Sequence, residues 1–233
     1  NNSFIKSNTS EQKEIKKINN KYFLINNSEE LHKLISLIKK TGYFAIDTET
    51  NSLNIEEAHL VGVSIAVNEN SAYYIPINHK NLEDNKRLKE QIKESEIIQL
   101  LQPICNDPSI LKIGHNIKYD IRILEKYGFK LTSIADTMLL SYAIDNGVTK
   151  HNMDDLAYLH FNHTNIKFKE LVGSGKKEIT FDFVEISKAL DYAAEDALIT
   201  LKLFNFLNNR VKKEKGNFVY SEIDLPLINV LSS

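Results

Sequence analysis

The stretch Tyr43-Phe-Ala-Ile-Asp-Thr-Glu49 decides the fold of this 233-residue chain, together with the two segments that follow it. The three segments, at 43–49, 59–67 and 72–77, are rich in β-branched and aromatic residues, which favours strands. Their close succession suits a β-meander. Further short strands are predicted at 111–114 and 133–136, between patterns that are mostly helical. The predicted fold class is therefore α/β, a mixed β-sheet with helices packed against it.

Helices are predicted where apolar residues recur every three or four positions. The first begins with Ser28 as its cap, and the second runs from about Asn116 to Tyr127 and ends at Gly128. The longest runs from about 187 to 213 and has one apolar face.

The composition is that of an ordinary globular protein, with 42% hydrophobic and 26% charged residues. The 29 basic and 31 acidic residues nearly cancel, so the overall charge indicates no nucleic-acid or membrane partner. The longest nearly apolar stretch, 60–67, is far shorter than the ~20 residues of a membrane span. A single cysteine, Cys105, excludes an internal disulfide and a cysteine-cluster metal site, and fits a reducing compartment.

Two carboxylates lie at the end of the first long strand. Side chains alternate along a strand, so Asp47 and Glu49 emerge on the same face. This pair is weak evidence by itself, because one Asp-x-Glu is expected by chance and a solvated strand end has the same pattern.

Two more acidic residues follow on helices, each four positions after a polar residue. Asn116 and Asp120 share one helix face, and so do Tyr192 and Asp196. Each pair also has a purely structural interpretation: Asn116 could cap its helix with Asp120 on the surface, and the second pair could be exposed.

Four clustered carboxylates would repel one another, so a fold that gathers them either raises their pKa values or binds hard cations. Without a cysteine cluster or a His-x-x-x-His pair, Mg²⁺ or Mn²⁺ is favoured over zinc. Paired divalent ions suit in-line attack on a phosphodiester, which indicates phosphoryl transfer. His115 is the histidine nearest this predicted site, and a packed or hydrogen-bonded role is favoured for it over a catalytic one.

Three motifs carry a family resemblance. Phe44-Ala-Ile-Asp-Thr-Glu-Thr-Asn-Ser-Leu53, Gly114-His-Asn-Ile-Lys-Tyr-Asp120 and Asp191-Tyr-Ala-Ala-Glu-Asp196 resemble, in order and separation, the exonuclease motifs of the DnaQ-like DEDD superfamily. A tyrosine four positions before the last aspartate marks the DEDDy branch.

The segments between and after these motifs resemble one particular family within this superfamily. Residues 136–142, 151–156 and 168–176 look like the proofreading domain of the bacterial DNA polymerase I family, or family A. Residues 222–231 are similar to the first helix of that family's polymerase domain. The resemblance implies an RNase H-like exonuclease fold, two divalent cations and removal of nucleotides from a DNA 3′ end as 5′-monophosphates.

The resemblance also assigns roles to the site residues. Asp47, Glu49 and Asp196 would hold one cation, and Asp47 with Asp120 would hold the second. Tyr192 would orient the attacking water together with Glu49.

Four further residues are predicted to bind the substrate strand. Leu53, Asn116 and Phe168 would hold the frayed strand, since apolar and aromatic contacts tolerate any base. Lys150 stands where better-known relatives have arginine, so it keeps the positive charge but lacks bidentate phosphate geometry.

The predicted organisation is a linker at 1–20, an exonuclease domain at 21–215 and the start of a polymerase domain at 216–233. We expect a monomer that acts on single-stranded or frayed 3′ DNA ends and joins a polymerase domain of the same polypeptide. A location in the bacterial cytoplasm at the nucleoid is expected, or in an organelle if the source is eukaryotic. Two alternatives remain: a catalytically silent domain that supports the polymerase or guides DNA, and an RNA-trimming nuclease of the same superfamily.

Overall fold

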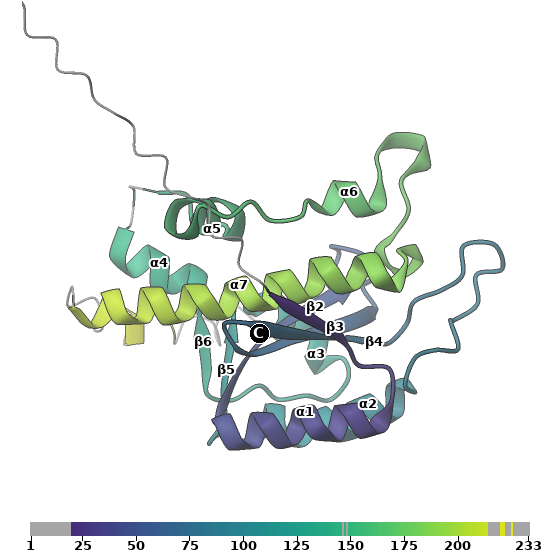
Figure 1. Ribbon diagram of the computed structural model, residues 1–233, viewed down its shortest axis with the longest axis horizontal. Helices are drawn as coiled ribbons and strands as arrows, with labels where there is room; N and C mark the ends of the chain where they lie inside the picture. The colour runs from purple at the N-terminus through teal and green to yellow at the C-terminus, as the bar shows by residue number, and fades with distance from the viewer. Residues whose placement is uncertain (1–19, 146, 148, 214–219, 222–224, 226–233) are drawn as a thin grey trace, which may run out of the picture.

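The computed structural model describes residues 20–145, 147, 149–213, 220–221 and 225 (Figure 1). Strands and helices are interspersed up to residue 136, and only helices follow in the described part of the chain. In chain order the elements are β1 (Lys21–Leu24), α1 (Ser28–Thr41), β2 (Tyr43–Thr50), β3 (Leu60–Asn68), β4 (Ser71–Pro76), α2 (Glu94–Asn106), β5 (Leu111–Gly114), α3 (Lys118–Glu125), β6 (Ile134–Asp136), α4 (Thr137–Asp145), α5 (Met153–Phe161), α6 (Phe168–Val172), the 3₁₀ turns η1 (Gly175–Lys177) and η2 (Phe181–Phe183), and α7 (Ile186–Lys213).

The strands form one mixed sheet in the order β1-β4-β3-β2-β5-β6. β2, β3 and β4 are antiparallel neighbours, which confirms the predicted meander. β5 and β6 extend the sheet in parallel beyond β2, and β1 lies parallel to β4 at the other edge. The predicted α/β fold class is therefore confirmed, and β2 is a central strand.

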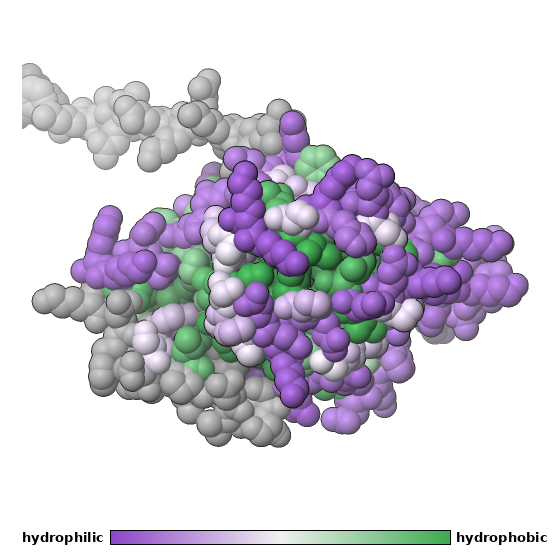
Figure 2. Space-filling view, turned by 90° about the horizontal axis from the view of Figure 1, so that it is seen from below, coloured by the Kyte–Doolittle hydropathy of each residue, from purple (hydrophilic) through white to green (hydrophobic). Residues whose placement is uncertain are grey.

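One face of the sheet is covered by α1 and α2 and is filled with large aliphatic and aromatic side chains (Figure 1). Phe44 and Ile46 of β2 point to this face and are almost fully buried. Seen from below, hydrophilic side chains surround an apolar area at the centre of the molecule (Figure 2). This face holds the larger hydrophobic cluster, and Asp47 and Glu49 of β2 point to the opposite face.

The opposite face is covered by α7 and is lined with alanine where helix and sheet meet (Figure 1). Ala45 and Ala66 of the sheet pack in one cluster with Ala194 and Ala197 of the helix, and all four are fully buried. Because alanine side chains are short, the helix axis can lie close to the sheet. This close packing brings α7 next to β2.

Two predicted helix starts are wrong by one or two residues. The cap of α1 is Asn27, whose side chain accepts a hydrogen bond from the Glu30 amide, and Ser28 is already in the helix. α3 begins at Lys118 because Asn116 has a left-handed φ of 60°. The Asp136 carboxylate, from the end of β6, accepts hydrogen bonds from the amides that precede α3. A distant side chain therefore does what Asn116 was predicted to do.

None of the helices in the described ranges combines the length and the apolar character that crossing a membrane requires. Of the predicted linker at 1–20, all but Asn20 lies outside the described residues. Of the predicted polymerase start at 216–233, only 220, 221 and 225 are described. Both assignments stay predictions.

Candidate active site

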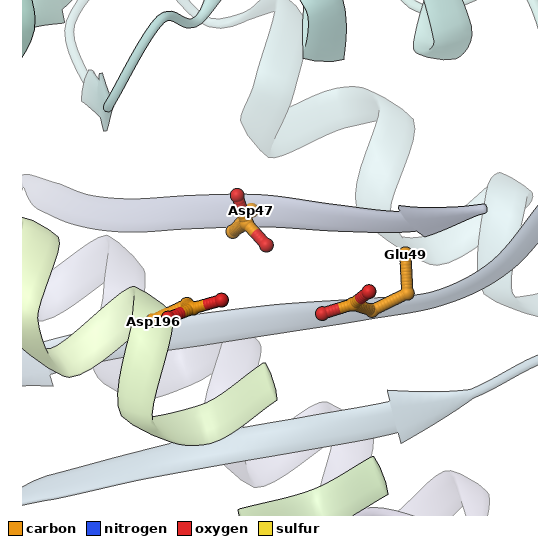
Figure 3. A group of neighbouring side chains, drawn as sticks. All are labelled: Asp47, Glu49 and Asp196. Carbon is orange, nitrogen blue, oxygen red and sulfur yellow. The ribbon is translucent and has the colours of Figure 1, made fainter. Parts of the chain in front are cut away.

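Three carboxylates converge where β2 passes under α7. Asp47 and Glu49 come from β2 and Asp196 comes from α7, and their side chains point toward one another (Figure 3). One carboxylate oxygen from each lies within 4.8 Å of the other two. The strand alternation that puts Asp47 and Glu49 on one face is thus confirmed, and the alanine packing of α7 supplies the third group.

Asp120 stands apart from these three. Its Oδ1 accepts hydrogen bonds from the Thr48 amide, at 2.9 Å, and from the Thr48 hydroxyl, at 2.6 Å. Thr48 alternates with Asp47 and Glu49 along β2, so it faces the other side of the sheet. Asp120 therefore reaches the site from the α3 side and is close enough for Asp47 to raise its pKa.

All four carboxyl groups have raised pKa values, and burial is the main cause in each. The pKa of Glu49 lies well above its ordinary value because of burial and then the charges of Asp47, Asp196 and Asp120. Burial and the Asp196 charge raise the pKa of Asp47. Burial raises the pKa of Asp196 to about 8, although a hydrogen bond from Tyr192 opposes the shift. The site therefore strongly disfavours negative charge unless positive charge enters it.

Glu49 has an unused ligand atom. Its side chain is only 6% exposed, and its Oε1 is buried without a hydrogen-bond partner among the described residues. A buried carboxylate oxygen without a partner is costly, and such oxygens are the ligands that hard divalent cations prefer. The donor set and the unpartnered oxygen fit a divalent cation.

Tyr192 lies one helical turn before Asp196 on α7, with its hydroxyl next to the carboxylates. Burial, followed by the charges of Asp196, Glu49 and Asp47, raises its pKa far above the ordinary value. The phenol therefore stays protonated at any physiological pH and can act as a hydrogen-bond donor.

A cavity of about 540 Å³ opens from the carboxylates. Of the four residues predicted to bind the strand, only Leu53 and Phe168 line it. Leu53 is part of the cavity wall and is 90% exposed. Phe168 stacks on Phe181 with ring centroids 6.1 Å apart and meets the Tyr192 ring edge-on.

The other two predicted strand-binding residues lie elsewhere. The backbone N–H of Asn116 donates a hydrogen bond to Asp136 Oδ1, and the residue is not part of the cavity wall. Lys150 is largely exposed and its ammonium lies 3.9 Å from the Asp155 carboxylate. The structure does not bring either side chain to the carboxylates.

Tyr119 lines the same cavity, and the sequence interpretation missed it. Its hydroxyl bonds to the Thr50 hydroxyl at 2.6 Å and donates to the Ser52 carbonyl at 2.9 Å. These bonds hold the loop that presents Leu53. Its position directly before Asp120 in the second motif was the available signal.

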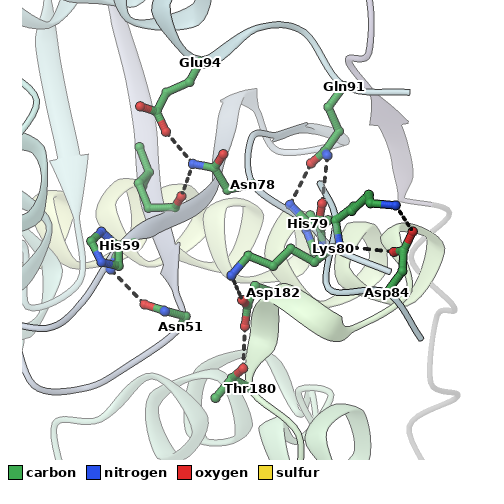
Figure 4. A network of polar contacts seen from close by, with 12 residues as sticks. Asn51, His59, Asn78, His79, Lys80, Asp84, Gln91, Glu94, Thr180 and Asp182 are labelled. Atoms are coloured by element: carbon green, nitrogen blue, oxygen red, sulfur yellow. Dashed lines mark hydrogen bonds and ion pairs between the residues drawn. The ribbon is translucent and has the colours of Figure 1, made fainter. Parts of the chain in front are cut away.

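Residues 178–181 form one wall of the cavity, and the residues directly after them are bonded to the segment that follows β4 (Figure 4). Lys80 makes an ion pair with Asp182 at 2.9 Å, and its amide donates to the Asp182 carbonyl at 2.7 Å. His79 Nδ1 donates to the Val184 carbonyl, while its Nε2 accepts from the Tyr74 hydroxyl. Burial lowers the pKa of His79 to about 4, so this neutral tautomer persists at pH 7.

Gly62 makes room for the Tyr74 side chain, which bonds to His79. It is the cross-strand partner of Glu49, and a Cβ there would lie 2.2 Å from the Tyr74 hydroxyl oxygen. A side chain at this position would displace the tyrosine that anchors His79.

His115 is half-buried, and its Nδ1 lies 2.8 Å from the Thr137 hydroxyl. Burial lowers its pKa to about 4. This agrees with the packed, hydrogen-bonded role that the sequence favoured over a catalytic one.

Comparison with known proteins identifies relatives of this chain. The 3′-5′ exonuclease family matches residues 22–212. DNA polymerase I of Rhizobium leguminosarum is 38% identical over 229 residues, which cover 91% of this chain and 22% of that protein. DNA polymerase I of Pseudomonas aeruginosa is 37% identical over 199 residues, covering 84% of this chain and 21% of that protein. The chain thus spans about a fifth of the length of these relatives.

The fold is also found in solved nuclease structures. Brucella melitensis NrnC superposes with a TM-score of 0.61 at 21% identity, covering 91% of this chain and 95% of that one. This likeness confirms the RNase H-like exonuclease fold that the motifs predicted. The matched range, the two relatives and the shared fold together place the chain in the 3′-5′ exonuclease family of DNA polymerase I.

Proposed function

We propose that this chain is a divalent-metal-dependent 3′-to-5′ exodeoxyribonuclease, the proofreading domain of a family A DNA polymerase. The observation that carries the proposal is the approach of three carboxylate ligand atoms to within 4.8 Å, one of them on a glutamate with an unpartnered buried oxygen. A group of this kind is stable only when positive charge enters it, and hydrolysis of a phosphodiester needs that charge at the same place.

The residues present would hold two cations, Mg²⁺ or Mn²⁺. Asp47, Glu49 and Asp196 supply the ligands of the first, and Asp47 with Asp120 those of the second. When bound, the ions would neutralise charge on the phosphate oxygens and lower the pKa of the attacking water. Thr48 fixes Asp120 through two hydrogen bonds, so the second ligand set is orientated before a cation arrives.

Hydrolysis forms a bond between the water oxygen and phosphorus and breaks the bond from phosphorus to the 3′ oxygen of the preceding nucleotide. That oxygen takes a proton, so the products are a nucleoside 5′-monophosphate and a strand with a new 3′ hydroxyl. Tyr192 and Glu49 would orient the water, and the high pKa of Tyr192 suits a hydrogen-bonding role rather than that of a base.

The cavity would take the terminal nucleotide. Leu53 and Phe168 line it and offer apolar and aromatic contacts that do not depend on base identity. Asn116 and Lys150 lie outside its wall and would contact the strand only farther from the reacting phosphate. This arrangement suits a 3′ end that has left its partner strand.

The proposal extends to the rest of the protein. Because the matched relatives are full-length DNA polymerases, we infer that residues 21–215 form the exonuclease domain and that 216–233 begin a polymerase domain. We also propose a monomer that works in the bacterial cytoplasm at the nucleoid, with 1–20 as a linker.

A trimming assay on end-labelled DNA tests the function. Asp196→Ala should remove trimming, whereas Asp191→Ala should not, because Asp191 is exposed on the same helix and lies outside the cavity. Single strands and frayed 3′ mismatches should be cut faster than matched duplex ends, since unpairing costs a few kcal/mol. EDTA should stop the reaction, and Mg²⁺ or Mn²⁺ should restore it.

Each alternative has its own outcome in this assay. No trimming by the folded parent chain with either metal would favour the silent domain. Faster trimming of RNA than of DNA of the same sequence, or of matched than of frayed ends, would favour the RNA-trimming nuclease.

A further inference from the structure

Two described residues beyond the end of α7 contact the part of the molecule that carries Asp120. The hydroxyl of Tyr220 accepts a hydrogen bond from the Asp136 amide at 3.1 Å, although the two residues are 84 positions apart in the chain. Leu225 packs against the apolar cluster at the start of α3. Neither residue lines the cavity at the carboxylates, so both act on that region from outside it.

Tyr220 bonds to the sheet at its free edge. β6 is the last strand in the sheet order, so no further strand among the described residues pairs with its outer side. Asp136, at the end of this strand, is only 2% exposed, and a buried amide needs a hydrogen-bond partner. The Tyr220 hydroxyl is such a partner, while its ring packs against the apolar cluster that α4, α5 and α7 share. Tyr220 therefore connects this cluster to the end of β6.

The side chain of Asp136 in turn holds the start of α3. Its carboxylate accepts hydrogen bonds from the amides of Asn116, at 3.2 Å, and Ile117, at 2.9 Å. The amides of Met138 and Leu139, in α4, donate to the same carboxylate. A shift of the Asp136 backbone would therefore move the first turn of α3, which carries the carboxylate proposed to bind the second cation.

Leu225 contacts the same helix through apolar side chains. It packs with Ile117 and Ile121, which are buried and lie one helical turn apart. Ile121 directly follows Asp120, whose carboxylate is held at its other end by the two hydrogen bonds from Thr48. The sheet thus orients the Asp120 side chain, and residues from beyond α7 hold the helix from which it projects.

We propose that Tyr220 and Leu225 are positioning residues for Asp120 and thereby set the affinity of the second cation site. Tyr220 acts through Asp136, and Leu225 acts through its packing on α3. This inference rests on the proposed exonuclease function. It adds that the second cation site depends on the junction with the proposed polymerase domain, because both residues lie within 216–233.

The metal dependence of trimming by the full chain tests this proposal. Tyr220→Phe keeps the ring and removes the hydroxyl. It should raise the Mg²⁺ concentration for half-maximal trimming of single-stranded DNA by about 2- to 10-fold, the effect of one hydrogen bond. Because excess metal fills a weakened site by mass action, the rate at saturating Mg²⁺ should return to that of the parent.

Leu225→Ala should raise the same Mg²⁺ concentration, since it removes the apolar contact with α3. Tyr158→Phe and Leu82→Ala are the matched controls. Both of these residues are exposed and lie outside the cavity wall, so neither change should shift the metal dependence.

Amide hydrogen exchange of the metal-free chain gives a readout that needs no activity. Tyr220→Phe should speed exchange in peptides that cover 116–125, compared with Tyr158→Phe. Exchange over α1, on the opposite side of the sheet, should be the same in both variants and serves as the internal reference.

An unchanged half-maximal Mg²⁺ concentration in Tyr220→Phe would overturn the proposal. Equal slowing at every Mg²⁺ concentration would indicate a general structural role and would also overturn it. If the parent chain trims no DNA with either metal, the exonuclease assignment fails, and the exchange comparison decides the positioning role separately. Faster exchange over 116–125 in Tyr220→Phe would then support the role, and exchange equal to that of the control would overturn it.

Discussion

The two faces of β2 come from alternate residues of one eight-residue strand, and one face is apolar whereas the other carries carboxylates. Toward α1 and α2 the strand presents Phe44 and Ile46, which are buried in a large apolar cluster. Toward α7 it presents Ala45, then Asp47 and Glu49. The first face gains free energy by burying apolar area, whereas the second gathers like charges at a cost. The comparison teaches that stability and chemistry can be separated by strand alternation alone.

The charged face should show the largest effect. Asp47→Ala should reduce trimming to background, because both proposed cations lose a ligand. Unfolding free energy without metal should stay equal or rise, since the change removes a buried charge that raises the pKa of its neighbours. Trimming rates measure the first effect, and urea unfolding measures the second. Residual activity near that of the parent would remove the two-cation scheme.

Tyr192→Phe should have the next largest effect. The loss of one positioning hydroxyl should slow trimming by ~10- to 1000-fold, with the fold and Mn²⁺ binding unchanged. Single-turnover rates at saturating metal provide the measurement. A rate equal to that of the parent would take Tyr192 out of the mechanism.

Neighbouring positions on β2 allow the two faces to be compared directly. Ala45→Val adds bulk between β2 and α7, should cost about 1–3 kcal/mol of stability and should slow trimming by moving Asp196. Ile46→Val removes one methylene from the other face and should cost about 0.5–1.5 kcal/mol without affecting the rate. Equal rates for the two variants, after correction for the folded fraction, would show that α7 packing does not set the site.

The stability of the metal-free protein should also depend on pH, with no substitution needed to show it. Folding raises the pKa of Asp196 from 3.8 to about 8 and those of Asp47 and Glu49 in the same direction, so the folded state binds more protons than the unfolded chain. Stability should therefore fall as pH rises from about 4 to about 8. Millimolar Mn²⁺ should restore several degrees of melting temperature at pH 8. If adding Mn²⁺ does not change the melting temperature at pH 8, the result would contradict a preformed site.

Local patterns were enough to predict much of this site. Strand alternation put Asp47 and Glu49 together, and helix spacing put Tyr192 beside Asp196. The position of Asp120 could not be predicted in this way, because it depends on two hydrogen bonds to Thr48, which lies 72 positions earlier in the chain.

Contacts between distant residues also explain the weaker predictions. The start of α3 depends on the Asp136 carboxylate, so no pattern around Asn116 reveals it. Lys150 precedes His151, whose Nδ1 lies 2.8 Å from the Ser141 hydroxyl and whose ring packs on Tyr142. These contacts fix the neighbourhood of Lys150, and no periodic pattern of the sequence contains them.

The alanine layer between β2 and α7 has a consequence for motion at the site. Alanine has no side-chain torsion to change, so Ala45, Ala66, Ala194 and Ala197 lose no rotamer freedom on folding and have none left to absorb a displacement. These four residues therefore leave little side-chain freedom that could change the separation of Asp196 from Asp47. A nuclease built on such a layer avoids the entropic cost of ordering its site at each turnover, because that ordering was completed when the chain folded.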